Sequence, residues 1–177
     1  MKYIYILIIL AMFSCKKEEQ GTLGSAEYFG VVSANQNEVD WESSEPYAYE
    51  NFANGTGISL SFPVYDNFER LRETLTFSKI PFSPGTYRLE DANLQEDDGK
   101  VGSFFSFDDV DLVLAYYVVL ESDSSSFITL ESFDEETQEV RGTFDVTFIK
   151  RNHYDTTQEF PDTLRFRDGV FHTKLVF

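Results

Sequence analysis

Hydrophobic and polar residues alternate along most of the chain from residue 28 onward, which is the pattern of strands with one buried and one exposed face. Residues 143–148 show it most clearly, because Phe144, Val146 and Phe148 alternate with polar neighbours. Most of the other phenylalanines alternate in the same way, and we expect them to fill the core. Further segments rich in the β-branched and aromatic residues that favour strands are residues 57–64, 116–121 and 126–133.

The C-terminal segment predicts a β-hairpin. Residues 163–167 and 170–177 both alternate, and Asp168 and Gly169 separate them. An Asp-Gly pair between two such runs favours a type I′ turn, because both central residues of that turn have positive φ.

Two further glycines predict local features of the backbone. Gly85 follows Pro84, and this order favours a type II turn in which the glycine takes positive φ. Gly142 stands just before a strand, where a glycine indicates a bulge or the close approach of another backbone. We expect both glycines to have architectural roles.

Helical periodicity is weak, and residues 68–73 are the best candidates for one or two helical turns. Short strands about ten residues apart are typical of antiparallel sandwiches and barrels. The sequence therefore predicts an all-β fold, an antiparallel β-sandwich or partly open β-barrel with at most one short helix. No internal repeat or second linker divides residues 28–177, so we expect a single β domain there.

The N-terminus has the pattern of a secretion signal. Lys2 precedes an apolar run at residues 3–13, which matches the charged and hydrophobic regions of a signal peptide. A membrane-spanning helix needs roughly 20 apolar residues, and this run is too short for that. A signal peptide over residues 1–14 is therefore favoured over a membrane-spanning anchor.

The single cysteine, Cys15, lies where this signal peptide would be cleaved. Residues 12–14 before it resemble the lipobox that lipoprotein signal peptidase recognises. The charged residues 16–19 that follow argue against a buried cysteine. We therefore predict that Cys15 carries the acyl chains that anchor the protein to a membrane, and that residues 15–27 form the lipidated end and a flexible tether.

Composition and charge limit the function further. The chain has 177 residues, a net charge of −17 and 42% hydrophobic residues. It is therefore long enough to bury a core and too apolar to be disordered. Its 31 acidic residues against 14 basic ones argue against a nucleic-acid partner. A lone cysteine also excludes an intramolecular disulfide and a multi-cysteine metal site.

A resemblance to a known family rests on several short motifs in order along the chain. Cys15 is followed by Trp41, by Pro84-Gly85-Thr86-Tyr87, by residues 142–146 and by residues 164–171. This order resembles the "GTY … GTF … G-x-F" pattern of small Bacteroidota lipoproteins of unknown function. The resemblance implies an all-β cell-envelope lipoprotein with no assigned activity, and it carries no catalytic residues.

The location follows from the same N-terminal residues. Cys15 with the charged residues 16–19 looks like the export signal of surface-exposed lipoproteins in Bacteroidota, and a simple solvated tether is the alternative. We therefore expect a lipid-anchored protein of the outer membrane, facing either the outside or the periplasm.

Candidate chemical groups are few. His153 lies in a polar stretch and His172 on the polar side of the last strand, and two histidines alone do not supply a zinc site. No serine-nucleophile motif is present, so we expect neither enzymatic activity nor a cofactor. Among the acidic clusters, Asp108 and Asp111 are the best candidates for calcium ligands. The alternative is that these acids keep loops and edge strands soluble.

The aromatic residues offer the remaining candidates for binding. A tyrosine hydroxyl needs water or a polar partner, so some of these rings should reach the surface. The leading candidates for a platform that stacks against a sugar or a partner are Trp41, Tyr47, Tyr49 and Tyr65. Tyr116 and Tyr117 belong to the same set, and the alternative for all of them is packing in the core and on the sheet.

These features favour a non-enzymatic, lipid-anchored envelope lipoprotein whose β domain binds a protein partner or ligand. The alternative is a carbohydrate- or calcium-binding accessory protein of a surface glycan system. A third possibility is a structural component of a larger envelope assembly. A closed interior would favour binding at the surface, and an open, aromatic-lined one would favour a small ligand.

Overall fold

The computed structural model describes residues 30–43, 45–50, 57–92, 99–154 and 157–176. Strands and turns account for all the regular structure of these residues, so the all-β prediction is confirmed. The eleven strands are β1 (Val31–Gln36), β2 (Val39–Ser43), β3 (Tyr47–Glu50), β4 (Ile58–Tyr65), β5 (Leu71–Ile80), β6 (Gly85–Asp91), β7 (Val101–Asp109), β8 (Leu112–Val119), β9 (Phe127–Phe133), β10 (Glu139–His153) and β11 (Thr163–Lys174).

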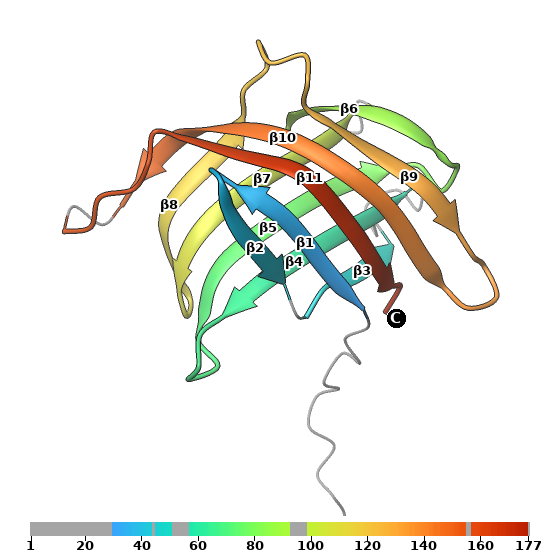
Figure 1. Cartoon of the computed structure of the whole chain (residues 1–177), viewed down its shortest axis with the longest axis horizontal. Coiled ribbons are helices and arrows are strands. Elements are labelled where there is room, and N and C mark those ends of the chain that lie inside the picture. Colours follow the sequence, from blue (N-terminus) through green and yellow to red (C-terminus); the bar gives the residue numbers. More distant parts are fainter. Residues whose placement is uncertain (1–29, 44, 51–56, 93–98, 155–156, 177) are drawn as a thin grey trace, which may run out of the picture.

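The strands form one sheet that folds over on itself into a sandwich-like body. Their order is β2-β1-β11-β10-β9-β6-β7-β5-β4-β3, and β8 pairs with both β10 and β7. All neighbours are antiparallel except β6 and β7, so the sheet is mixed rather than purely antiparallel. Figure 1 shows β1, β11 and β10 crossing in front of β4, β5 and β7. A bridge between Ala48 in β3 and Leu175 after β11 brings the two sides together.

Two long strands change partners along their length. One edge of β10 pairs with β9 at residues 140–145 and with β8 at residues 148–153. In the same way, β7 pairs with β6 at residues 101–103 and with β8 at residues 104–109. The two layers are therefore joined by β8 at one end and by β6 and β9 at the other, and the sheet is not a regular barrel.

Phenylalanine rings fill the space between the layers, as the alternation predicted. Neighbouring rings lie close together, with Phe77 and Phe144 centroids 5.1 Å apart and Phe105 and Phe166 centroids 5.4 Å apart. Each fully buried ring contributes about 1.5–3 kcal/mol relative to an exposed one. The phenylalanines with no exposed surface are Phe62, Phe77, Phe105, Phe144, Phe148 and Phe166.

The hairpin predicted at Asp168-Gly169 is wrong. Residues 163–174 form one continuous strand, β11, and the pairing with β10 shifts register at this point. Asp168 takes positive φ (54°), and its amide donates to Asp145 Oδ1 over 3.2 Å. A left-handed residue before a glycine suits a bulge as well as a turn. Gly169 is needed because a Cβ there would lie 2.6 Å from the Phe144 ring.

The prediction for Gly142 is confirmed, and the one for Gly85 is wrong. At Gly142 the pairing of β10 with β9 shifts register, and a Cβ would overlap the Thr129 carbonyl oxygen. Gly85 instead begins β6 without positive φ, and its nearest neighbour is the flexible Tyr87 side chain at 3.2 Å. The type II turn is therefore absent at this described residue.

The short helix predicted near residues 68–73 is also wrong. Residues 66–70 form the turn between β4 and β5. Asp66 Oδ1 accepts the amide N–H groups of Phe68 at 2.8 Å and Arg70 at 3.1 Å. An aspartate that bonds its own downstream backbone in this way favours a turn over a helix.

Candidate functional site

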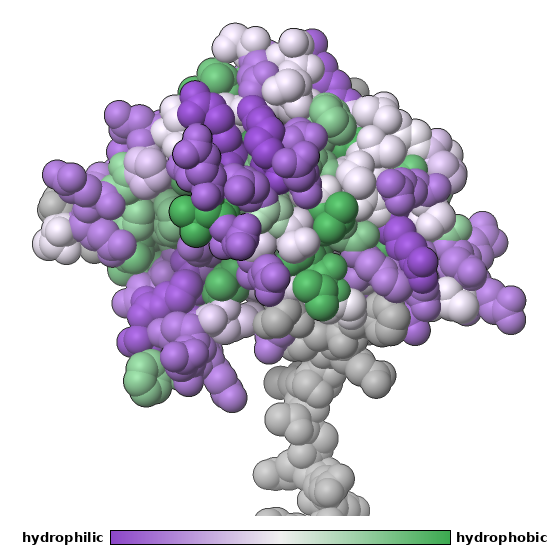
Figure 2. All heavy atoms as spheres, in the orientation of Figure 1, coloured by the Kyte–Doolittle hydropathy of each residue, from purple (hydrophilic) through white to green (hydrophobic). Residues whose placement is uncertain are grey.

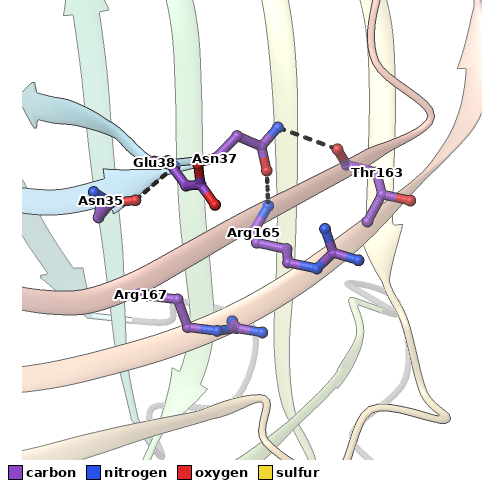
Figure 3. A pocket seen from close by; sticks show the side chains of 6 residues that line it. All are labelled: Asn35, Asn37, Glu38, Thr163, Arg165 and Arg167. Carbon is purple, nitrogen blue, oxygen red and sulfur yellow. Dashed lines mark hydrogen bonds between the residues drawn. The ribbon is translucent and has the colours of Figure 1, made fainter.

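Buried rings fill the described interior, so the candidate sites among the described residues lie on the outer surface. Figure 2 shows strongly hydrophilic residues gathered over β10 and β11 on the face seen there. On this side, a polar groove of about 380 Å³ lies where the turn between β1 and β2 crosses β11. The residues that line it are Asn35, Asn37, Glu38, Thr163, Arg165 and Arg167, and we call it the Arg165 groove (Figure 3).

The turn that forms one wall of the groove is held against β11 by Asn37. Asn37 and Glu38 both have positive φ, at 49° and 68°, as a two-residue hairpin turn requires. Three hydrogen bonds then link Asn37 to β11. Its amide donates to the Arg165 carbonyl oxygen (2.9 Å), its Oδ1 accepts the Arg165 amide (2.9 Å), and its Nδ2 donates to the Thr163 carbonyl oxygen (3.3 Å). Asn37 therefore extends the β1–β11 pairing past the end of β1.

The two arginines of the groove lie on the outer face of β11 because they alternate with buried Leu164 and Phe166. Arg167 is held in place: its Nη2 donates to Thr147 Oγ1 (2.8 Å) and its Nη1 donates to the Phe166 carbonyl oxygen (2.9 Å). The Arg165 guanidinium has no hydrogen bond or ion pair with any described residue. Figure 3 shows the two side chains extending in the same direction.

Neither histidine joins this groove. His153 ends β10, and its ring packs edge-on against Phe160 with centroids 5.3 Å apart. His172 lies further along β11, where its Nε2 is 3.0 Å from Glu139 Oε2. The hydrogen bond from Arg141, with this one from His172 as a smaller contribution, holds the pKa of the Glu139 carboxyl below its usual value. The position of His172 on the polar face agrees with the prediction.

The structure places the four leading aromatic candidates in different environments. Trp41 is only 5% exposed, packs edge-on against Phe166 and is therefore part of the core. Tyr47 and Tyr49 do lie together on β3, with ring centroids 6.0 Å apart. Tyr65 ends β4, four residues beyond the Ser61 that faces Tyr47. A single platform of all four rings is therefore absent from the described residues.

The two calcium candidates are also in different environments. Asp108 is buried, and its Oδ2 accepts the hydroxyls of Ser106 (2.8 Å) and Thr74 (3.1 Å). Burial raises the pKa of its carboxyl. Asp111 is exposed in the turn between β7 and β8. Among the described residues, no three or more acidic, histidine or cysteine side chains are grouped as metal ligands.

An exposed apolar patch is formed by residues of β8 and by Tyr154, which follows the end of β10. Leu112 is 60% exposed and Tyr154 is 61% exposed, and together with Val113 and Tyr116 they line a shallow recess of about 340 Å³. Leu112 and Val113 follow the acidic residues 108–111 and were not predicted to be exposed, whereas Tyr116 is one of the aromatic candidates. Patches of this kind often mark contact sites.

The sequence indicates part of the Arg165 groove, although the groove was not predicted from it. Arg165 and Arg167 alternate with Leu164 and Phe166, so a shared outer face follows from the strand pattern alone. An asparagine between two alternating runs is also typical of a tight turn. The contact between Asn37 and Arg165 could not be predicted from the sequence, because 128 positions separate the two residues.

A half-buried carboxylate beside Trp41 gives a testable dependence on pH. Glu73 Oε2 accepts the Trp41 Nε1–H over 2.8 Å. Burial raises the pKa of Glu73, and the indole hydrogen bond only partly opposes this. Because the folded-state pKa is raised, folding favours the protonated acid. Stability is therefore gained as the pH falls from neutral through that pKa.

We expect Glu73→Gln to be more stable than the unmodified chain near neutral pH, because glutamine still accepts the indole hydrogen bond and carries no charge. The difference should shrink as the pH falls toward the ordinary pKa of glutamate, about 4.3. Urea unfolding followed by fluorescence of Trp41, the only tryptophan in the chain, measures both effects. Glu42→Gln, at an exposed glutamate next to Trp41, is the control. A stability difference independent of pH would contradict the prediction.

Comparison with protein-family models, with curated proteins and with solved structures finds no match for this chain. The described residues include no helix with the length and hydrophobicity of a membrane span. The predicted signal peptide, Cys15 and the tether lie outside the described residues.

Proposed function

We propose that the protein is a non-enzymatic, lipid-anchored lipoprotein of the cell envelope whose β domain binds a ligand or partner at its outer surface. The anchor is supported by the sequence pattern at residues 1–19, in which a charged residue and an apolar run precede Cys15. Two or more acyl chains on this cysteine would give stable attachment, since each buried methylene contributes about 0.8 kcal/mol.

The proposal that the domain binds at its surface rests on one observation: the interior is filled, whereas two recesses on the surface are open. Rings with no exposed area occupy the space between the layers, where a sandwich or barrel would otherwise hold a small molecule. The Arg165 groove and the apolar patch at Leu112 and Tyr154 are both open to solvent. Surface contact is therefore the binding mode that this architecture favours.

Acyl labelling in cells tests the anchor. The full chain should incorporate an alkyne analogue of palmitate and fractionate with outer membranes. Cys15→Ala should lose the label entirely, because the only thiol in the chain is gone. Ser14→Ala is the matched control, since a small residue remains before Cys15 and labelling should persist. An unlabelled wild-type chain, or equal labelling of Cys15→Ala, would overturn the proposal.

A further inference from the structure

We propose that the Arg165 groove binds a ligand bearing one oxyanion group, a carboxylate or a phosphate or sulfate ester, with Arg165 as its main contact. This inference rests on the surface-binding part of the proposed function and is independent of the lipid anchor. Arginine suits such a group because its planar guanidinium donates two parallel hydrogen bonds to two oxygens.

The first argument is that the Arg165 guanidinium has no partner among the described residues, although the chain is rich in acids. Acidic residues outnumber basic ones by 31 to 14. Every other arginine of the described residues bonds to a carboxylate, carbonyl or hydroxyl. These pairs are Arg70 and Arg72 with Asp66, Arg88 with the Glu121 carbonyl, Arg141 with Glu139, Arg151 with Asp91, and Arg167 with Thr147.

The second argument is that the groove is preorganised around this free cation. The Arg165 backbone is bonded on both its amide and its carbonyl to Asn37. Arg167, two residues along the same face, is fixed by its bonds to Thr147 and the Phe166 carbonyl. Residues two apart on a strand face the same way and lie about 7 Å from each other along it. One oxyanion can thus bind the Arg165 guanidinium, with the positive charge of Arg167 nearby on the same face of the strand.

The neutral lining adds donors for the rest of the ligand. The Asn35 Oδ1 atom is occupied by the Glu38 amide at 2.7 Å, which leaves the Asn35 amide nitrogen as a donor. The Thr163 side chain also lines the groove. These groups suit the hydroxyls of a small polar molecule such as an acidic sugar.

Glu38 limits the negative charge of the ligand that fits. Its carboxylate lines the same groove and is exposed. A second negative group on the ligand would meet this carboxylate, and the whole chain carries a net charge of −17. A long polyanion is therefore disfavoured, and a single charged group on an otherwise neutral molecule is favoured.

Calorimetric titration of the full chain in detergent, at constant ionic strength, tests the proposal with glucuronate, glucose 6-phosphate and neutral glucose. We expect at least one charged sugar to bind and glucose to show no heat. Binding of glucuronate alone assigns a carboxylate, and binding of glucose 6-phosphate alone assigns a phosphate ester. Arg165→Gln should weaken binding by about tenfold or more, as for loss of a hydrogen bond to a charged group.

Two further variants test whether the ligand binds in this groove or responds only to the net charge of the protein. Glu38→Gln should tighten binding by about two- to fivefold, because it removes a negative charge that repels the anionic ligand. Arg141→Gln removes the same charge as Arg165→Gln from the neighbouring strand β10, where the arginine is already paired with Glu139, and should change the affinity less than about twofold.

The inference fails if neither charged sugar binds, if glucose binds equally well, or if Arg165→Gln and Arg141→Gln lose affinity alike. Melting followed by Trp41 fluorescence establishes that each variant is folded. None of these results depends on acyl labelling at Cys15, so failure of the oxyanion site and failure of the anchor are distinguishable.

Discussion

Replacement of Phe105 by alanine is expected to lower the free energy of unfolding by about 3–5 kcal/mol, the range for deleting a large buried ring. Phe105 has no exposed surface and lies at the centre of the aromatic cluster. Its ring centroid is 5.0 Å from that of Phe107, 5.4 Å from that of Phe166 and 5.9 Å from that of Tyr117. These rings come from both layers, so the cavity left behind cannot close by movement of one strand.

Phe104→Ala is the matched control for this substitution. Phe104 precedes Phe105 on β7 but points to the opposite face, where it is half-buried beside Tyr116. We expect it to cost less than half as much, because little surrounding structure encloses the ring. Urea denaturation followed by circular dichroism measures both variants. Equal losses would contradict the assignment of Phe105 to the centre of the core.

Gly142→Ala is the second substitution with a large expected effect. A single methyl group at this position would overlap the Thr129 carbonyl oxygen and come within 2.6 Å of the Phe171 ring. Thr129 belongs to β9 and Phe171 to β11, so β10 is confined from both sides. Overpacking of this kind costs about 3 kcal/mol, and here a backbone atom would have to move.

The matched control for Gly142 is Gly85→Ala. A methyl group on Gly85 would meet only the end of the Tyr87 side chain, at 3.2 Å, and this side chain can rotate away. We expect a loss of less than about 1 kcal/mol. Thermal melting of the two variants makes the comparison. A Gly142→Ala chain as stable as wild type would show that β9 and β11 do not confine β10 as described.

Local alternation was sufficient to predict several of the strands, because burial of one face imposes a period of two wherever the sheet covers a core. Residues 143–148 lie in β10, and residues 127–133 of the predicted segment 126–133 form β9. Asp168-Gly169 shows where local information ends. An Asp-Gly pair serves a turn or a bulge, and here only Asp168 takes positive φ while Gly169 packs against the Phe144 ring, a contact that the local sequence does not reveal.

The candidate site was harder to predict than the fold. Trp41 was a reasonable surface candidate by residue type, but the sequence does not reveal that its face of β2 meets Phe166 and Glu73. The Arg165 groove depends on a contact between the first hairpin and the last strand. Contacts between such distant segments follow from topology, which alternation does not specify.

The pairing of β1 with β11 sets the order in which the domain can be completed. Val31 lies opposite His172, so β1 can pair with β2 early but acquires its second partner only when the last strand is available. A chain that emerges N-terminus first therefore leaves one edge of β1 without its partner until residues 163–174 have followed. Contacts so distant in sequence also slow folding. The topology thus delays closure of the domain until its last strand is present.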